Sequence, residues 1–327
     1  MKFKLLLTLA LAANVTGFAA VEEAIDSRFK PAAADPLVGD WQGTGGVVAQ
    51  VTLDEHGDYQ ANVLKQFDAA DNLVATLHGQ KRDGNVTLKG GGWSSAITGG
   101  HFKGTKDGAS FDLQHVTRPS PTLGAKAPAG AVVLFDGKNL DAFANKNGKE
   151  WIVENGPAPW KIVDGNLEVV PGTGGGIITH QKFGDCHLHV EFRTLGAPSN
   201  SGVFLQTRYE ADISEGYGKT EGSSLGNLGN CTPKGTFPGV RAARAVLEWQ
   251  TFDIDFRAPR FDAAGTKTAA ARMTVLLNGV KIYDQQELNQ PTGAAGRLGE
   301  APTGPLMLQE HGMPLQFRNI WLVPASP

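Results

Sequence analysis

Hydrogen-bonding and charged side chains alternate with mostly apolar ones along residues 200–213, NSGVFLQTRYEADI. Every second position from 206 onward carries such a group: Gln206, Arg208, Glu210 and Asp212. Successive side chains on a β-strand point to opposite faces, so these four would share one face of a sheet. An amide, a guanidinium and two carboxylates in a row, with no lysine among them, favour a surface that binds a polar ligand.

The two carboxylates in this row are the first candidates for catalysis. Glu210 and Asp212 stand two positions apart on one face, where they could share a cation or shift each other's pKa. Each could therefore act as a base or as a metal ligand. Gln206 and Arg208 are predicted to bind substrate, the arginine by donating to sugar hydroxyls or to an oxyanion. Alternatively, Arg208 only neutralises the two carboxylates.

A second polar row occurs in CHLHVEFRT, residues 186–194, where polar and apolar positions again alternate. If this strand lies in the same sheet as residues 202–213, the two rows form one chemical surface. Glu191 is then a further catalytic candidate, and Arg193 would bind substrate. In the alternative interpretation His187 and His189 are only exposed, and Glu191 and Arg193 form a cross-strand ion pair worth less than about 1 kcal/mol.

The C-terminal segment contributes further candidates, and Trp249 is added from an earlier strand. His311 stands where a strand ends in a turn, beside carboxylates, as expected of a general base or metal ligand. A structural histidine is the alternative. Glu210, Asp212 and His311 together form the tentative metal site. Three more residues are predicted to bind substrate: Trp249 by stacking on a pyranose unless it is a core residue, Gln309, and Arg318.

The sequence that contains these residues indicates an all-β fold. It has 327 residues and 42 glycines, with short alternating runs separated by turn signals and no βαβ rhythm. We expect a small β-rich domain at residues 37–117 and a Pro/Ala/Gly-rich linker at 118–130. Residues 131–327 would form one jelly-roll sandwich, which includes predicted strands at 187–194 and 202–213.

The N-terminus and the composition indicate where the protein acts. Residues 1–19 resemble a secretory signal peptide, with two lysines before an apolar run too short to span a bilayer well. The mature chain would be periplasmic or secreted, without an integral membrane span. A net charge of −3 and the lack of a basic run argue against nucleic-acid binding. Cys186 and Cys231 could pair in an oxidising compartment, or could be two buried thiols.

Six segments that occur in order along residues 131–324 are similar to one protein family: LFDGKNLDAF, FGDCHLHVEFR, NSGVFLQTRYE, EWQTFDIDFRAPRFD, LNGV and LQEHGMPLQFRNI. They resemble the 3-keto-disaccharide hydrolase domain of secreted bacterial proteins. The resemblance implies a concanavalin A-like jelly roll with its ligand on the concave sheet. Two positions depart from the family pattern, Asp212 in place of glutamine and Phe237 in place of tyrosine.

The resemblance also implies an activity, the cleavage of glycosides whose C3 hydroxyl has been oxidised to a ketone. The ketone acidifies the C2 hydrogen, so that a base can remove it and the enolate can expel the C1 aglycone. Such a site needs a carboxylate or histidine base, and a cation or donor facing the enolate oxygen. A divalent metal ion could serve as that cation; no nucleotide or organic cofactor is expected.

Two other functions remain open from the sequence. A non-catalytic carbohydrate-binding protein could use the same face, because this fold hosts both kinds of protein. A conventional glycosidase would need two carboxyl groups about 5 to 9 Å apart.

Overall fold

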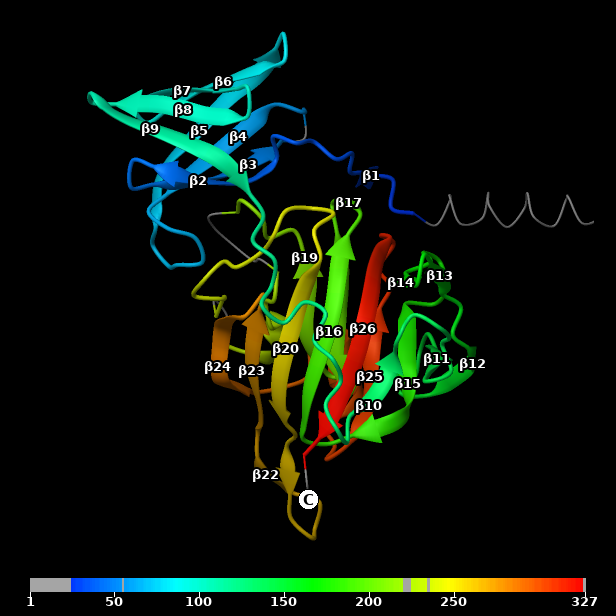
Figure 1. Cartoon of the computed structure of the whole chain (residues 1–327). Coiled ribbons are helices and arrows are strands. Elements are labelled where there is room, and N and C mark those ends of the chain that lie inside the picture. Colours follow the sequence, from blue (N-terminus) through cyan, green and yellow to red (C-terminus); the bar gives the residue numbers. More distant parts are fainter. Residues whose placement is uncertain (1–24, 55, 220–224, 234–235, 326–327) are drawn as a thin grey trace, which may run out of the picture.

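The computed structural model describes residues 25–54, 56–219, 225–233 and 236–325. Figure 1 shows a β-barrel at the N-terminal end of the chain and a two-sheet sandwich that follows it. The predicted fold class is confirmed: an all-β jelly-roll sandwich with a smaller N-terminal β-rich domain. The predicted signal peptide, residues 1–19, lies outside the described residues.

The barrel is an antiparallel meander in which each strand pairs with the next and β2 closes the ring by pairing with β9. Its strands are β2 (Gly39–Thr44), β3 (Val48–Leu53), β4 (Tyr59–Leu64), β5 (Leu73–Arg82), β6 (Asn85–Gly90), β7 (Trp93–Thr98), β8 (His101–Lys106) and β9 (Ala109–Val116). Alternate residues point inward, so that Val86 and Leu88 of β6 are fully buried. Asp83-Gly84 joins β5 to β6 with both φ angles positive, as a tight hairpin turn requires.

The sandwich consists of two antiparallel sheets. The large sheet has the order β13 (Lys161–Val163), β14 (Asn166–Glu168), β26 (Leu315–Pro324), β16 (Cys186–Thr194), β20 (Gln250–Arg257), β23 (Ala271–Leu277) and β24 (Val280–Leu288), with β10 (Val132–Phe135) also paired to β26. The small sheet has the order β12 (Glu154–Pro157), β11 (Phe143–Lys146), β15 (Gly176–Phe183), β25 (Gly304–Gln309), β18 (Asn200–Leu205) and β19 (Tyr209–Ser214).

The remaining elements are short. Two strand pairs lie outside the sheets: β1 (Lys30–Pro31) with β17 (Gly196–Ala197), and β21 (Arg260–Phe261) with β22 (Lys267–Ala269). Two 3₁₀ helices, η1 (Gly229–Cys231) and η2 (Gly293–Leu298), lie in the loops near β19. Among the described residues, no helix has the length and apolar character needed to cross a membrane.

The two sheets enclose the main hydrophobic core. Leu188, Val190 and Phe192 of β16 face it from the large sheet, and Val203 and Leu205 of β18 face it from the small sheet. The polar residues that alternate with them must therefore point away from the core on each sheet. The sandwich consequently has two polar outer faces rather than one.

The prediction that residues 202–213 form one strand is wrong. They fold into the hairpin of β18 and β19, in which Leu205 pairs with Tyr209 across a turn. Gln206 and Thr207 adopt positive φ in that turn. Leu205 and Tyr209 both face the core, because they are an even number of positions apart. The alternation of polar and apolar residues therefore continues through the turn, and the sequence pattern gives no sign that a turn is present.

The expected pairing of the two polar rows in one sheet is also wrong. Residues 186–194 form β16 at the middle of the large sheet, whereas β18 and β19 belong to the small sheet. The hydrophobic core separates the two rows. They form two separate surfaces.

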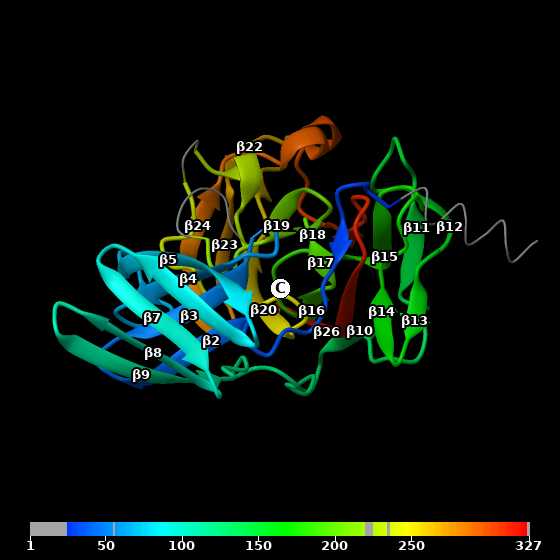
Figure 2. The same ribbon diagram turned by 90° about the horizontal axis from the view of Figure 1, so that it is seen from above.

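Residues 118–130 run from the barrel down across the outer face of the large sheet before β10 begins (Figure 1). The segment is anchored at several points along this path. The Ser120 hydroxyl lies 2.6 Å from that of Thr251, and the Gly124 N–H donates to the Glu191 carboxylate. Figure 2 shows the barrel on the side of the sandwich that carries β23 and β24, away from β11 and β12.

The two cysteines are not bonded to each other. Cys186 on β16 and Cys231 in η1 are both free and buried, so the alternative of two buried thiols is the one that holds. Burial raises the pKa of Cys186 to about 12 and that of Cys231 to about 11. Both groups are therefore neutral thiols at ordinary pH.

Candidate functional site

The outer surface of the large sheet, which we call the linker face, carries six residues singled out from the sequence: His187, His189, Glu191, Arg193, Trp249 and Arg318. Glu191 is its most buried carboxylate and has a partner for each oxygen. Oε2 accepts from Arg318 Nε at 2.6 Å, and Oε1 accepts from Gly124 N at 2.5 Å and Asn319 Nδ2 at 2.8 Å. Glu191 therefore has no free oxygen with which to act on a substrate.

Electrostatics on the linker face hold Glu191 in its charged form. Burial alone would raise the pKa of Glu191, but hydrogen bonds from His189, Asn319, Arg318 and the Gly124 N–H outweigh it and lower the pKa to about 2. Burial would lower the pKa of His189, yet Asp253, 2.6 Å from Nδ1, and Glu191 raise it. These groups satisfy one another beneath the linker.

The remaining residues of the linker face are also occupied. Arg193 donates through Nε and Nη2 to Gln316 Oε1, not to Glu191, so the expected pair with Glu191 does not form. The Trp249 ring lies against both Arg193 and Arg318, with guanidinium carbons 4.8 and 4.0 Å from its centroid. The tryptophan is thus neither a core residue nor an open platform for a sugar ring.

The outer surface of the small sheet, which we call the carboxylate face, has the opposite character. Glu210 and Asp212 project from β19, as the alternation predicted, next to Gly202 and Phe204 of the paired strand. A Cβ on Gly202 would lie 2.6 Å from Glu210 Oε1. Glycine at this position lets the carboxylate lie flat across the neighbouring strand, over the space that a side chain would fill.

The Glu210 carboxylate has no hydrogen bond or ion pair with any described residue. Only its backbone is tied down, by donation from N to Thr292 Oγ1 at 3.1 Å. Burial, together with the charge of Asp212, raises the pKa of Glu210 to about 8. A partly buried, unpartnered carboxylate with a raised pKa is typical of a catalytic acid or base.

Asp212 has a milder environment. Burial raises its pKa to about 6, against a hydrogen bond from Ser214 Oγ to Oδ2 at 2.6 Å. The nearby charges of Glu215, Lys219 and His311 contribute less. The two carboxyl groups therefore have different proton affinities, which is the usual arrangement when one acts as a base and the other supports it.

Positive charge lies further along the same face, on residues that the sequence analysis did not single out. Lys146 of β11 is buried, and its Nζ lies 4.9 Å from the centroid of the Trp151 ring. Arg297 of η2 contacts the same ring at 4.8 Å. The Trp151 ring in turn meets Phe204 edge-on, with the centroids 6.1 Å apart. Both cations therefore contact Trp151 over the small sheet, which also carries Glu210.

Lys146 also lacks a matched partner. No hydrogen bond or ion pair joins its ammonium group to a described residue, although the charge of Glu310 acts on it. Burial and the neighbouring Arg297 lower its pKa. Among the described residues, the carboxyl group of Glu210 and the ammonium group of Lys146 thus lack a hydrogen-bonding or ion-pairing partner. A ligand with both an acidic hydrogen and developing negative charge could engage each of them.

The candidates near the C-terminus, Gln309 and His311, have different surroundings. Gln309 lies on the carboxylate face, and its buried Oε1 accepts no hydrogen bond within the described structure, so it could accept one from a substrate. Glu310 is held by the N–H groups of Gly175 and Gly312, at 3.0 and 2.7 Å. His311 is exposed at the edge of this face.

Gln206 and Arg208 are not part of either face, contrary to the prediction that they bind substrate. Both are buried in the turn between β18 and β19. Gln206 Nε2 donates to Pro302 O at 3.0 Å, and Arg208 donates to the carbonyls of Gly299 and Gln206 at 2.5 and 2.9 Å. Arg208 forms no ion pair with Glu210 and therefore does not neutralise it. It fastens the segment that follows η2 to the end of the sandwich.

The tentative metal site does not fit the geometry. Among the described residues, no three His, Cys, Asp or Glu side chains come together as a cluster that could hold a metal ion, and this includes Glu210, Asp212 and His311.

Little in the sequence could have identified Lys146 or Arg297. Lys146 occurs in NKNGKEW beside Lys149, and only the fold shows which of the two is buried. Arg297 lies in η2, a 3₁₀ helix too short to show a periodic pattern in the sequence. Trp151, in the loop between β11 and β12, was the available signal.

Comparisons with known proteins confirm the resemblance seen in the sequence. The family described as the 3-keto-alpha-glucoside-1,2-lyase-like domain matches residues 130–323, more than half of the chain. A solved structure from Parabacteroides distasonis ATCC 8503, described as a "putative glycosyl hydrolase", is 32% identical with a TM-score of 0.53. The match covers 61% of this chain and 85% of that one.

A second structure from the same organism with the same description is 16% identical, with a TM-score of 0.43 over 60% of this chain and 94% of the other. The search of curated proteins found no match. The matched region contains both sheets of the sandwich and leaves the barrel outside it.

Proposed function

Because this chain belongs to the 3-keto-alpha-glucoside-1,2-lyase-like domain family, we propose that it cleaves 3-keto-glycosides or 3-keto-disaccharides on the carboxylate face. The family and the related glycosyl hydrolase structure support a glycoside-cleaving enzyme. The substrate and the mechanism are our own proposal. The single observation that carries it is the Glu210 carboxylate, which has no partner and a pKa raised to about 8.

Glu210 is the proposed base. The C3 ketone makes the C2 hydrogen acidic, and a carboxylate whose pKa lies near the working pH removes such a proton most effectively. The electron pair of the C2–H bond then forms the enolate of the ketone. When the C3 carbonyl re-forms, a double bond forms between C1 and C2 and the C1–oxygen bond breaks.

The leaving aglycone takes up one proton as the C1–oxygen bond breaks. The protonated Glu210 is one source, and Asp212, whose pKa is about 6, is a second. The unsaturated 3-keto sugar is then released as a lyase product. If water adds across C1 and C2 before release, the net reaction is hydrolysis. No oxidant or reductant is consumed in either case.

The two cations are proposed to face the enolate oxygen. A fixed positive charge stabilises negative charge that develops in the transition state, and this effect is largest where water is excluded. Lys146 is buried and Arg297 is exposed, so the lysine would be the fixed charge and the arginine an adjustable one. Trp151 and Phe204 form the apolar surface between these cations and Glu210.

Secretion is part of the proposal. The predicted signal peptide at residues 1–19 would place the enzyme in the periplasm or outside the cell.

The deciding experiment is an assay of purified protein with 4-nitrophenyl 3-keto-glucoside, matched to the same glucoside with an unoxidised C3 hydroxyl. We expect release of nitrophenol only from the keto substrate, and its loss in Glu210→Gln. Cleavage of the unoxidised glucoside would instead indicate a conventional glycosidase. Saturable binding of the keto-glucoside without any release would indicate a non-catalytic carbohydrate-binding protein.

A further inference from the structure

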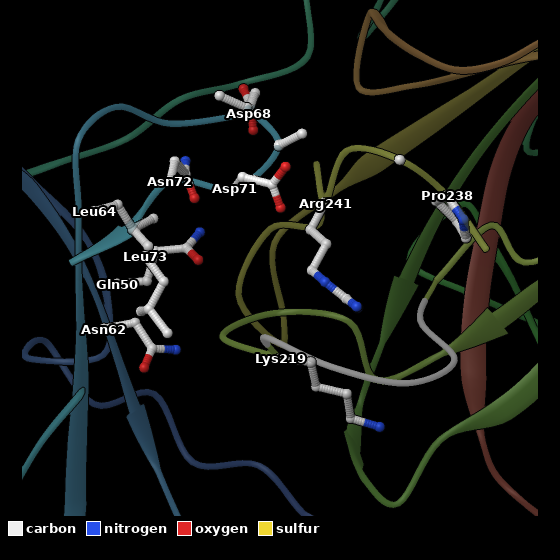
Figure 3. Close-up of a pocket in the computed structure, with 13 residues that line it drawn as sticks. Gln50, Asn62, Leu64, Asp68, Asp71, Asn72, Leu73, Lys219, Pro238 and Arg241 are labelled. Atoms are coloured by element: carbon white, nitrogen blue, oxygen red, sulfur yellow. The ribbon is translucent and has the colours of Figure 1, made fainter. Parts of the chain in front are cut away.

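A cavity of about 390 Å³ lies between the barrel and the sandwich (Figure 3). The barrel contributes residues of β3, β4, the start of β5 and the loop 65–72, and the sandwich contributes Lys219 and residues 238–241. Its volume falls within the range typical of small-molecule sites. Neither the family match nor the proposed reaction assigns a role to it.

The barrel wall of the cavity is fixed in place. Loop 65–72 is closed by donation from Lys65 N to Asn72 O at 2.9 Å and from Asn72 Nδ2 to Gln66 O at 2.5 Å. Asp68 in this loop forms ion pairs with Arg118 at 2.6 Å and with Arg244 at 3.1 Å. Arg244 belongs to the sandwich, so the same aspartate also joins the two domains.

The opposite wall follows directly from the strand that carries Glu210. After β19 the chain reaches Gly218, whose carbonyl accepts from Asn62 Nδ2 of the barrel at 2.6 Å. A Cβ on Gly218 would lie 2.5 Å from Thr52 Cγ2, and its φ is +69°. Only glycine allows this close approach, which sets the spacing between the two walls.

The lining has the chemistry of a sugar site. Gln50, Asn62 and Asn72 bring side-chain amides to the lining. Asn62 is engaged with Gly218, Gln60 and Thr76, whereas Gln50 Oε1 and Asn72 Oδ1 accept from no described residue and could accept from hydroxyl groups. Leu73, 44% exposed, and Leu64 supply an apolar surface for the C–H groups of a sugar ring.

The charges in the lining disfavour an ionic ligand. Asp68 is paired with Arg118 and Arg244, and Lys219 lies 3.6 Å from Glu215. Asp71 and Arg241 add one charge of each sign to the lining. Asp71 has no hydrogen bond or ion pair with a described residue, and its carboxylate would repel an anion while accepting from a hydroxyl group. Figure 3 shows Asp71 and Arg241 on opposite sides of the opening.

We propose that this cavity binds a neutral oligosaccharide, as a second carbohydrate site distinct from the carboxylate face. Binding there would hold a glycan chain beside the enzyme while a different sugar unit is cleaved. The site does not depend on the Glu210 chemistry, and it can be tested without turnover.

The test is isothermal titration of the full chain with cellotriose, maltotriose, laminaritriose and xylotriose. We expect at least one to bind saturably, and Leu73→Trp to weaken that binding at least tenfold by filling the cavity. Leu53→Trp is the matched control, because Leu53 is 43% exposed on the same barrel but does not line the cavity. The control should bind as the unaltered protein does.

Binding should also survive in Glu210→Gln, which separates this site from the proposed reaction. The proposal is overturned if none of the four trisaccharides binds, or if Leu73→Trp and Leu53→Trp bind equally well. Loss of binding in Glu210→Gln would place the sugar on the carboxylate face instead. Competition by glucuronate or inorganic phosphate would indicate an anion site and would equally contradict it.

Discussion

The two outer faces of the sandwich carry similar residues and have opposite electrostatics. On the linker face, Glu191 is enclosed by donors and its pKa falls to about 2. On the carboxylate face, Glu210 is enclosed by apolar and acidic groups and its pKa rises to about 8. The same side chain, on strands of the same sandwich, is thus held charged in one place and held close to neutrality in the other.

This difference shows that the number of ionisable groups on a strand is a poor guide to function. CHLHVEFRT is as rich in such groups as the segment that contains Glu210, yet its glutamate accepts from Gly124 of the linker and its buried histidine pairs with Asp253. What distinguishes a candidate site is a charge left without a partner, because its desolvation is not offset by any contact within the protein.

The largest expected effect is on catalysis. Glu210→Gln should lower kcat on a 3-keto-glucoside by about 10²–10⁴-fold, because it removes the proposed base. The fold should be retained, since the change removes a buried charge that no donor compensates. The matched variant is Glu191→Gln, which should keep kcat within a few fold of the unaltered enzyme. Equal losses in both variants would contradict the distinction between the two faces.

The next effect is on stability and concerns the linker face. Glu191→Ala should reduce the free energy of unfolding by about 3 kcal/mol, because Arg318 and the Gly124 N–H lose a buried charged partner. Urea denaturation at pH 7 would measure it, with Glu210→Ala as the comparison. If Glu210→Ala proves the more destabilising of the two, Glu210 has a structural partner after all.

The pH dependence of stability should separate the faces by its sign. The pKa of Glu210 is raised from its ordinary value of 4.5 to about 8, so its contribution is present below pH 4.5 and is lost as the pH rises through 8. The pKa of Glu191 is lowered from 4.5 to about 2, so its contribution is present above pH 4.5 and is lost as the pH falls through 2.

Denaturation curves at a series of pH values can test both slopes. Glu210→Gln should flatten the decline in stability between pH 4.5 and 8, and Glu191→Gln should flatten the decline between pH 4.5 and 2. Each variant should leave the other range unchanged. A common response in both ranges would mean that the two carboxylates do not have opposite environments.

The smallest expected effect concerns the contact between Trp151 and its two cations. Trp151→Ala should raise KM for the 3-keto-glucoside about fivefold, equivalent to about 1 kcal/mol, because Lys146 and Arg297 lose the ring that gathers them. On the linker face, Trp249→Ala removes a similar ring between two arginines and should leave KM unchanged. A matching rise in KM for both variants would contradict the proposal that Trp151 and its two cations contact the substrate.

Much of the fold follows from local patterns. Period-two alternation predicted β16 closely and placed Glu210 and Asp212 together on one outer face, because a buried sheet surface forces that spacing. The family segments supplied the jelly roll. Alternation could not reveal the turn at Gln206, because a turn that keeps Leu205 and Tyr209 in even register preserves the pattern.

The candidate site was harder to predict from the sequence than the fold was, for a different reason. Whether a row of polar side chains is a functional site depends on which residues contact it, and these residues come from distant parts of the chain. Glu191 is matched by Gly124 of the linker, 67 positions away, and Lys146 meets Arg297 through Trp151. Such long-range contacts leave no periodic trace, so the sequence could identify the carboxylates without showing which of them is free.

The linker has a consequence for how this protein could have been assembled from parts. A connecting segment that only spans a gap can be exchanged during evolution without disturbing either neighbour. Here Ser120, Thr122 and Gly124 complete the hydrogen bonding of Thr251, Asp253 and Glu191. The linker is therefore part of the surface of the sandwich as well as its connection to the barrel. Recombination at this junction would leave polar groups on the outer face of the large sheet without their hydrogen-bonding partners.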